Sequence, residues 1–214
     1  MEDIILLGLG GHAHSVVDSI EQTGDYHIIG FLDTKDKLGV KFKDYYVLDT
    51  DDALEKFYVH GIKNAFVTIG FMGYGTVRNR LYYQLKETGY QLPNIIDPSA
   101  VVSTNVKFEE GIFVGKKTVI NANVYIKKMC IINTGSIIEH DCVVEEYSHI
   151  AVGSVLCGGV SIGKQSFIGA NATVIQEIHI GNHVIVGAGS AITKNIEDHM
   201  IRYGMVEKMR DLEG

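Results

Sequence analysis

Residues 131–168 of the chain read IINTGSIIEHDCVVEEYSHIAVGSVLCGGVSIGKQSFI, and every sixth residue of this stretch, starting at Ile132, is aliphatic. The same register continues in both directions from Ile96 to Ile192, through seventeen apolar positions without an insertion. An amphipathic helix would repeat every 3.6 residues and a half-buried strand every two, so neither produces this period. A short fixed period sustained over so many repeats is typical of a β-solenoid, in which each turn of the chain stacks on the next.

Six residues are enough for one short strand and one tight corner, and three such strands would close a triangular coil of eighteen residues. We expect the aliphatic side chains to point inward and to stack from coil to coil at the strand spacing of about 4.8 Å. Each buried aliphatic side chain would stabilise the fold by about 1.5–3 kcal/mol. A small or β-branched residue often lies two positions before the aliphatic one, and these residues are Thr118, Cys130, Ser136, Cys142, Ser148, Ser154, Ser166, Ala172 and Ser190.

Stacking every eighteen residues divides the solenoid into three faces, named A, B and C. The inward residues are Val102, Ile120, Ile138, Leu156, Val174 and Ile192 on face A, Phe108, Ile126, Val144, Ile162 and Ile180 on face B, and Ile96, Val114, Ile132, Ile150, Ile168 and Val186 on face C. The preceding residue of each strand points outward, which makes the outer surfaces of faces A and C mainly apolar. Because large apolar patches mark interfaces and two different patches suit a closed ring, we predict a homotrimer in which face A packs against face C of the next subunit.

The overall composition limits the classes of partner. The chain has 214 residues and a net charge of −7, from 19 basic and 26 acidic residues, which argues against nucleic acid or an anionic membrane as the main partner. No apolar run approaches the ~20 residues of a membrane span, and the start Met1–Asp3 lacks the basic residues of a signal peptide, so no membrane insertion is expected. Three cysteines without a stacking relationship predict reduced thiols and a cytoplasmic location.

Residues 4 to about 90 follow a different pattern, in which short apolar strands alternate with helical segments. The expected strands are residues 4–7, 27–31 and 65–69, and the expected helices are residues 15–20, 51–57 and 76–86. Such alternation predicts a small parallel α/β sheet of the Rossmann-like type. We therefore predict two domains, a Rossmann-like domain at residues 1–92 and the β-solenoid, with a C-terminal tail, at residues 93–214.

A glycine-rich turn, GLGGHA at residues 8–13, follows the first predicted strand. Gly8, Gly10 and Ala13 fit the pattern G-x-G-x-x-G/A, and Asp33 follows at roughly the distance expected for a ribose contact. In this interpretation backbone N–H groups at a helix N-terminus hold a phosphate. The alternative is a strand-to-helix turn that merely needs small residues. Because a full dinucleotide fold would need about twice the residues, a mononucleotide is favoured over NAD.

Two further residues near this turn have more than one possible role. His12 lies at the predicted start of a helix, where it either faces the ligand or acts as a cap or a solvated side chain. A second glycine-rich stretch, residues 70–80, follows a predicted strand at the same carboxyl edge of the sheet. Within it, Arg78 is expected either to hold a phosphate or base or to lie on a solvated helix face.

The candidate for catalysis is the run Glu139-His140-Asp141, which places three ionisable residues together within the repeat. His140 occupies a corner between faces A and B, and Gly158 occupies the same corner one coil later. A glycine there would leave a backbone N–H open beside the imidazole. Acyl transfer needs a base for the proton of the nucleophile and a donor for the oxyanion. Asp141 or Glu139 could orient the imidazole, whereas a surface histidine without function is the alternative.

These features together resemble the family of bacterial nucleotide-sugar and sialic acid O-acetyltransferases. The resemblance rests on the glycine turn at residues 8–14, the run IEHDC at 138–142, the pair Ser148-His149 and the pair Asn133-Thr134, and it covers nearly the whole chain. It implies a left-handed parallel β-helix that binds acetyl-CoA as co-substrate and a Rossmann-like domain that holds a nucleotide-linked amino sugar. The implied reaction is acetyl-CoA-dependent N-acetylation of that sugar in bacterial surface glycan biosynthesis.

The resemblance also implies roles for individual residues. His140 would be the general base and Asp141 its support. Residues expected near acetyl-CoA are Asn133, His149, Gly158, Lys194 and Lys208, and residues expected near the sugar nucleotide are Gly8, Gly10, Gly11, His12, Asp33 and Arg78. The chain departs from the usual closing motif G-x-P-A-K, because residues 204–208 read GMVEK. This departure leaves the contact of that end with coenzyme A open.

Other functions remain possible from the sequence. An O-acetyltransferase acting on sialic acid or another sugar hydroxyl would use the same site. A γ-type carbonic anhydrase needs three histidines converging on zinc, and His140, His149, His179 and His183 do not share a stacking column. A nucleotide-binding oxidoreductase would use the glycine turn but would leave the solenoid without a task. A non-catalytic solenoid would have no need for an acidic pair around His140.

Overall fold

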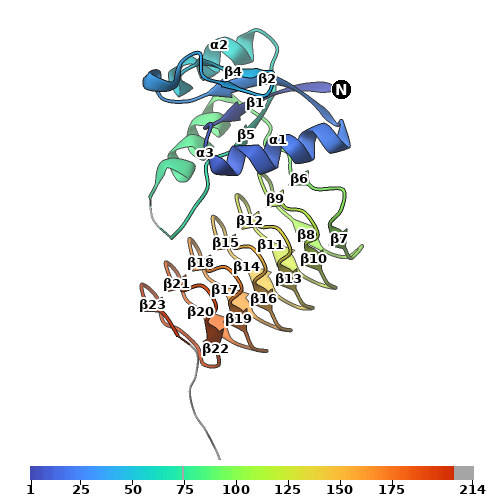
Figure 1. Ribbon diagram of the computed structural model, residues 1–214, viewed down its shortest axis with the longest axis vertical. Helices are drawn as coiled ribbons and strands as arrows, with labels where there is room; N and C mark the ends of the chain where they lie inside the picture. Colours follow the sequence, from blue (N-terminus) through green and yellow to red (C-terminus); the bar gives the residue numbers. More distant parts are fainter. Residues whose placement is uncertain (74, 205–214) are drawn as a thin grey trace, which may run out of the picture.

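The structure, a computed structural model, describes residues 1–73 and 75–204 and has two stacked parts. A small α/β unit, blue to green in Figure 1, lies on a long solenoid that runs from green to red. The predicted architecture, a small sheet with helices followed by a solenoid of hexapeptide repeats, is confirmed. In the described part of the chain, no helix is long and apolar enough to cross a membrane.

The N-terminal unit is built on a five-stranded sheet in the order β3-β4-β2-β1-β5. The strands are β1 (Glu2–Leu7), β2 (Tyr26–Leu32), β3 (Lys41–Phe42), β4 (Tyr45–Asp49) and β5 (Asn64–Val67), and the helices are α1 (Gly11–Thr23), α2 (Leu54–Val59) and α3 (Val77–Thr88), with the 3₁₀ turns η1 (Lys35–Lys37) and η2 (Asp51–Ala53). Within this sheet only β3 pairs antiparallel. The β3–β4 hairpin was not predicted, because strands of two and five residues give too little alternation to detect.

The solenoid consists of two-residue strands in three parallel sheets, one on each face. Face A contains β7 (Val101–Val102), β10 (Val119–Ile120), β13 (Ile137–Ile138), β16 (Val155–Leu156), β19 (Thr173–Val174) and β22 (Ala191–Ile192). Face B contains β8 (Lys107–Phe108), β11 (Tyr125–Ile126), β14 (Val143–Val144), β17 (Ser161–Ile162) and β20 (His179–Ile180). Face C contains β6 (Ile95–Ile96), β9 (Phe113–Val114), β12 (Ile131–Ile132), β15 (His149–Ile150), β18 (Phe167–Ile168), β21 (Ile185–Val186) and β23 (Ile201–Arg202). Successive strands from β6 to β22 pair in the predicted register of eighteen residues.

Small residues before the inward aliphatics lie inside the solenoid, next to the corners. The Ser148 hydroxyl donates a hydrogen bond to the Gly163 carbonyl oxygen at 2.7 Å and accepts one from the Ser166 N–H at 3.1 Å. The hydroxyl therefore satisfies backbone groups that a sharp corner would leave unpaired. Glycine is needed where corners stack closely, since a β-carbon on Gly163 would lie 2.5 Å from the carbonyl carbon of Gly181.

The predicted packing of face A against face C of a neighbouring subunit is wrong, because the N-terminal unit of the same chain covers face C. In Figure 1, α1 lies directly above the sheet that contains β9 and β12. Phe113 and Ile131 are each 1 % exposed and share one apolar cluster with Ala13 and Val17 of α1. The repeat does not predict what covers an apolar face, because a domain of the same chain and a neighbouring subunit can both bury it.

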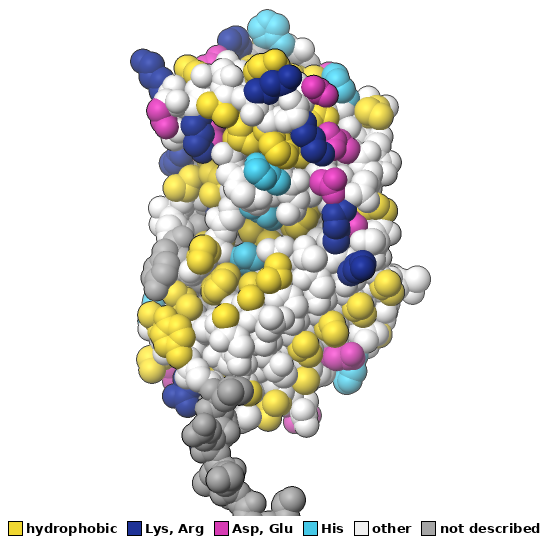
Figure 2. All heavy atoms as spheres, in the orientation of Figure 1, with side chains coloured by type: hydrophobic (Ala, Val, Ile, Leu, Met, Phe, Trp, Pro, Cys, Tyr) yellow, Lys and Arg dark blue, Asp and Glu magenta, His cyan; other side chains and the backbone are white. Residues whose placement is uncertain are grey.

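Face A keeps its apolar side chains at the surface of the single chain. Val101 is 65 % exposed, and Ile137 and Val155 are half-buried. The side of the solenoid seen in Figure 2 carries few charged side chains, whereas Lys, Arg, Asp and Glu gather on the N-terminal unit. Face A is therefore the apolar solenoid face that remains for contact with another subunit.

Candidate active site

The corner between faces A and B, called the His140 edge, carries His140, Asp141 and Gly158. His140 is the second residue after β13, following Glu139, and its side chain is exposed. Its Nδ1 lies 2.8 Å from Oδ2 of Asp141. Because a carboxylate only accepts hydrogen bonds, Nδ1 carries the imidazole proton and Nε2 is left with a free lone pair. This tautomer is the one that a general base requires.

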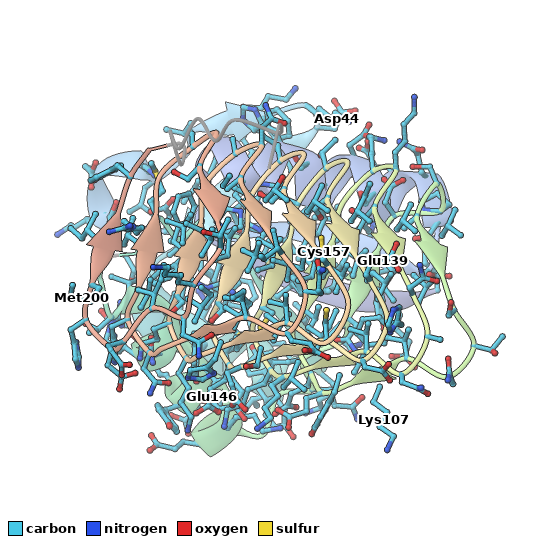
Figure 3. The ribbon with its side chains drawn as sticks, turned by 90° about the horizontal axis from the view of Figure 1, so that it is seen from below. Asp44, Lys107, Glu139, Glu146, Cys157 and Met200 are labelled. Atoms are coloured by element: carbon cyan, nitrogen blue, oxygen red, sulfur yellow. The ribbon has the colours of Figure 1, made fainter. Side chains whose placement is uncertain are left out.

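Gly158 lies in the slot of His140 one coil later, as predicted. A β-carbon at this position would lie 2.6 Å from Nε2 of His140, so any other residue would displace the imidazole. The Gly159 N–H donates to the His140 carbonyl oxygen at 2.9 Å and holds the two corners together. Among the described residues, the Gly158 N–H has no hydrogen-bond acceptor. Glu139 and Cys157, labelled in Figure 3, lie side by side just before these corners.

Asp141 adopts the left-handed conformation of a tight corner, with φ of 62°. Aspartate and asparagine tolerate this conformation better than most side chains. Hydrogen bonds from His140 and from Asn123 lower the pKa of Asp141 below its usual value. The carboxylate therefore stays ionised at neutral pH and can stabilise a positively charged imidazolium beside it.

The corner between faces C and A, called the Asn133 edge, lies at the opposite end of face A. Asn133 Nδ2 is 3.2 Å from His149 Nε2, and His149 Nδ1 is 2.5 Å from the Phe71 carbonyl oxygen. Because a carbonyl oxygen only accepts, His149 donates through Nδ1 and accepts from Asn133 through Nε2. Burial lowers the pKa of His149 to about 4, so the ring is neutral at pH 7. His149 therefore orients Asn133 rather than acting as a base.

The structure brings the predicted residues together in two groups within one chain. His140, Asp141 and Gly158 form one group, and Asn133 and His149 form the other. The two groups lie at opposite ends of face A, on either side of β13. A single chain therefore does not join them.

The glycine turn follows β1 and leads into α1, as predicted. Gly8 has φ of 99°, and a β-carbon there would collide with Ile69. A β-carbon on Gly10 or Gly11 would meet no described residue within 4 Å, so in this part of the structure the N-terminus of α1 is open to a ligand. Asp33 supports this turn, since its Oδ2 accepts from the Leu9 N–H at 2.6 Å. Although burial opposes it, hydrogen bonds from Lys37, Leu9 and Thr34 lower the pKa of Asp33.

Two residues predicted for the sugar nucleotide, His12 and Arg78, point elsewhere. His12 packs edge-on against Phe113 of the solenoid with ring centroids 5.0 Å apart, and its Nε2 is buried. Arg78 is 4 % exposed and donates to the carbonyl oxygens of Ile69, at 2.6 Å, and Met129. Arg78 therefore fastens α3 to the solenoid, in place of the phosphate contact expected from the glycine-rich sequence around it.

Two histidines, the half-buried His12 and the buried His149, make the fold sensitive to acid. Burial, with the charges of Arg78 and His149, lowers the pKa of His12 to about 3, and burial lowers that of His149 to about 4, from the ordinary histidine value of 6.5. The unfolded chain therefore binds more protons below pH 6.5, and the stabilisation present above 6.5 is lost as the pH falls toward 4. We expect the melting temperature to fall from pH 6.5 to 4.5 and His12→Gln to flatten this slope, as measured by thermal unfolding. An equally steep slope in the variant would contradict this account.

A small pocket at the carboxyl end of the sheet was only partly predicted. Its walls include Gly8, Asp33, Asp51, Val77 and Arg80, and Arg80 Nη1 lies 2.7 Å from Asp51 Oδ2. Arg78 was predicted from the run RNR at residues 78–80, yet Arg80, two positions later, lines the pocket. Residues two apart on a helix point in different directions. This difference in direction is the signal that could have distinguished Arg80 from Arg78.

Lys194 occupies the slot of His140 three coils later, at the far end of the same edge. It lines a cavity of about 430 Å³ together with Asn195, Met200 and Arg202. At about 4.8 Å per coil, this position is roughly 14 Å along the solenoid axis from His140. Lys208, also predicted for the acetyl-CoA side, lies outside the described residues, as do four of the five residues in the run 204–208.

Comparison with known proteins matches both parts of the chain. A family model described as the PglD N-terminal domain matches residues 3–85, and one described as a hexapeptide repeat of succinyl-transferase matches residues 159–194. A search of curated proteins gives no match. A histidine-to-alanine variant of GDP-perosamine N-acetyltransferase from Caulobacter crescentus, solved with CoA and GDP-perosamine, is 33 % identical, has a TM-score of 0.89, and the match covers 95 % of this chain and 94 % of that chain.

The chain belongs to the nucleotide-sugar acetyltransferase family. The acetyltransferase domain of PglB from Neisseria gonorrhoeae FA1090, solved with acetyl coenzyme A, is 28 % identical with a TM-score of 0.86, over 95 % of this chain and 96 % of that chain. WeeI from Acinetobacter baumannii AYE shares the fold at 22 % identity and a TM-score of 0.74, over 95 % and 97 %. The family confirms the left-handed solenoid, the acetyltransferase class and acetyl-CoA as the co-substrate that the sequence predicted.

Proposed function

We propose that this nucleotide-sugar acetyltransferase moves the acetyl group of acetyl-CoA to the amino group of a nucleotide-linked amino sugar. The observation that carries the proposal is the free Nε2 of His140, held by Asp141 beside the unpaired N–H of Gly158. The related enzyme solved with GDP-perosamine and CoA supports the amino-sugar acceptor. Three free cysteines agree with a reducing, cytoplasmic setting.

The geometry supports a direct transfer. Nε2 of His140 removes a proton from the amine as its nitrogen attacks the thioester carbonyl carbon. The Gly158 N–H donates to the oxyanion that develops on that carbon. When the C–S bond breaks, the imidazolium returns the proton to the departing thiolate. Asp141 stabilises the imidazolium throughout and keeps Nδ1 protonated.

A homotrimer with face A turned toward the threefold axis would complete the site. In this arrangement the His140 edge of one subunit meets the Asn133 edge of its neighbour, and the thioester lies in the groove between them. The exposed apolar residues of face A support this packing. We propose it in place of the predicted packing of face A against face C of the next subunit. Lys194 would face the same groove farther along the axis.

Ile137→Glu tests the trimer. The substitution places a charge at the centre of face A, where three subunits would bury it, and burying an unpaired charge is strongly unfavourable. We expect monomers in sedimentation velocity and little residual activity. Lys107→Glu on face B is the control and should remain a trimer. A wild-type monomer, or a trimeric Ile137→Glu variant, would contradict the packing.

The acceptor is tested with a panel of sugar nucleotides. Free thiol release from acetyl-CoA is measured with amino-sugar nucleotides, including GDP-perosamine, and with their hydroxyl counterparts. We expect turnover only with an amino group. Turnover with sialic acid or with a sugar hydroxyl would instead identify an O-acetyltransferase.

Gly10→Val tests the nucleotide-binding turn. The fold has room for the side chain, because a β-carbon at Gly10 meets none of the residues that the structure describes within 4 Å. A phosphate at the N-terminus of α1 would compete for that space. We expect the KM for the sugar nucleotide to rise about tenfold or more while the Kd for acetyl-CoA, measured by calorimetry, stays unchanged. Equal loss of both affinities would indicate misfolding, and no loss would place the phosphates elsewhere.

We place the boundary between the two domains at residues 92 and 93. The first solenoid strand, β6, begins two residues later at Ile95. A parallel bridge between Asn64 and Gln91 still ties the preceding residues to the N-terminal sheet.

A further inference from the structure

Two asparagines continue the His140 edge toward the N-terminal end of the solenoid. Asn123 occupies the slot of Asp141 one coil earlier, and Asn105 occupies that slot one coil before Asn123. Asn123 Nδ2 lies 3.0 Å from Asp141 Oδ1, and Asn105 Nδ2 lies 2.5 Å from Asn123 Oδ1. These side chains form one continuous line of hydrogen bonds that ends at His140.

The direction of every bond in this line is fixed by Asp141. Its carboxylate only accepts, so the Asn123 amide must present Nδ2 to it, which leaves Oδ1 to accept from Asn105. His140 donates to the other carboxylate oxygen, Oδ2, at 2.8 Å. Asp141 is therefore held from both sides, and each of its oxygens has a different partner.

The corner itself does not require an amide side chain at residue 123. Asn123 and Asp141 have φ of 61° and 62°, and Gly159 fills the same slot one coil later with φ of 71°. Glycine adopts this conformation without strain. The turn would therefore form with glycine at 123, and the amide is available for a role beyond the backbone.

We propose that Asn123, supported by Asn105, is a positioning residue that orients Asp141 and, through it, the imidazole of His140. The proposal rests on the proposed function of His140 as the base. Without Asn123 the exposed Asp141 carboxylate can rotate in water, and His140 then loses the fixed partner that keeps its proton on Nδ1. Nε2 would point toward the thioester groove for a smaller fraction of the time, which lowers kcat.

Asn123→Gly removes the amide and keeps the corner. We expect kcat to fall roughly tenfold, less than the ~10²–10⁴-fold effect of losing a general base, while the KM values for both substrates change by less than about twofold. Gln165→Gly is the matched control, because Gln165 is an amide at another left-handed corner, with φ of 52°, between faces B and C. We expect wild-type kcat from the control and unchanged melting temperatures and sedimentation for both variants.

Asn123→Asp tests the electrostatic coupling between residue 123 and His140, while the split between kcat and KM in Asn123→Gly separates positioning from a purely structural role. A second carboxylate next to Asp141 favours the protonated imidazolium of His140. The acidic limb of the pH profile of kcat/KM should therefore move to higher pH. The other ionisable groups at neighbouring positions of this edge are Glu139, Cys157 and Glu177, and none of them changes in the variant.

A double-variant cycle tests whether the asparagines act in series. Asn105→Ala should lower kcat less than Asn123→Gly, and the double variant should lose no more than Asn123→Gly alone. The proposal is overturned by a wild-type kcat in Asn123→Gly, by an unmoved acidic limb in Asn123→Asp, or by additive losses. Those outcomes leave the proposed function intact, which fails separately if His140→Ala keeps its activity.

Discussion

Replacing His140 with alanine is expected to lower kcat by about 10²–10⁴-fold, the usual contribution of a general base. The attacking amine then has no group to take its proton, while the Gly158 N–H and the groove remain. The KM for acetyl-CoA should change little, because among the described residues the exposed imidazole has no hydrogen-bond partner other than Asp141. Thiol release under saturating substrates measures the effect.

His179→Ala is the matched control for this experiment. His179 is also an exposed solenoid histidine, but it lies on face B and pairs with the Ser161 hydroxyl at 2.8 Å. We expect the control to retain wild-type kcat. If His140→Ala kept more than about a tenth of the activity, the base would have to be another group, because such a loss is smaller than base removal gives.

The solenoid could be predicted from the sequence because its interactions repeat. Each inward aliphatic, such as Ile138, meets the same kind of neighbour eighteen residues away, so period alone fixes strand, corner and register. The same arithmetic placed His140 above Gly158, and the structure shows them in that relation. Contacts within the solenoid thus join residues at a fixed separation of eighteen, so they can be predicted even though the residues are distant in the chain.

Contacts between the two parts could not be predicted in this way. Nothing in the sequence pairs Phe71 with His149 or Arg78 with Met129, because these contacts depend on how the N-terminal unit sits on face C. Face C was therefore mistaken for a subunit interface. The contact of His12 with Phe113 could not be predicted for the same reason, since it arises only after the parts have packed.

The same packing connects the proposed sugar-nucleotide pocket to one edge of the proposed acetyl-CoA groove. The Phe71 carbonyl belongs to the loop after β5, and the neighbouring residue Ile69 lines the pocket at the end of the N-terminal sheet. His149 joins this loop to Asn133 on the solenoid. The proposed sugar-nucleotide pocket and the Asn133 edge are therefore parts of one packed unit, and in the proposed trimer the His140 edge of a neighbouring subunit completes it.

Mixed trimers are expected to recover activity from two inactive parents. One parent carries His140→Ala, which destroys the His140 edge, and the other carries Asn133→Ala with His149→Ala, which destroys the Asn133 edge. After the two are unfolded together at equal amounts and refolded, each groove draws its edges from two adjacent subunits at random. About a quarter of the grooves should then receive both intact edges, which sets the expected activity near a quarter of wild type.

A site contained in one chain would give a different result, because every chain in the mixture carries one damaged edge. Activity would then stay at the level of the parents even though the subunits exchange. Exchange is checked independently by tagging one parent and recovering the untagged parent with it. Refolding each parent alone is the control, and recovery there would show incomplete inactivation. Recovery only in the mixture would establish that His140 of one subunit acts opposite Asn133 of its neighbour, which is the arrangement that we propose from the exposed face A and the covered face C.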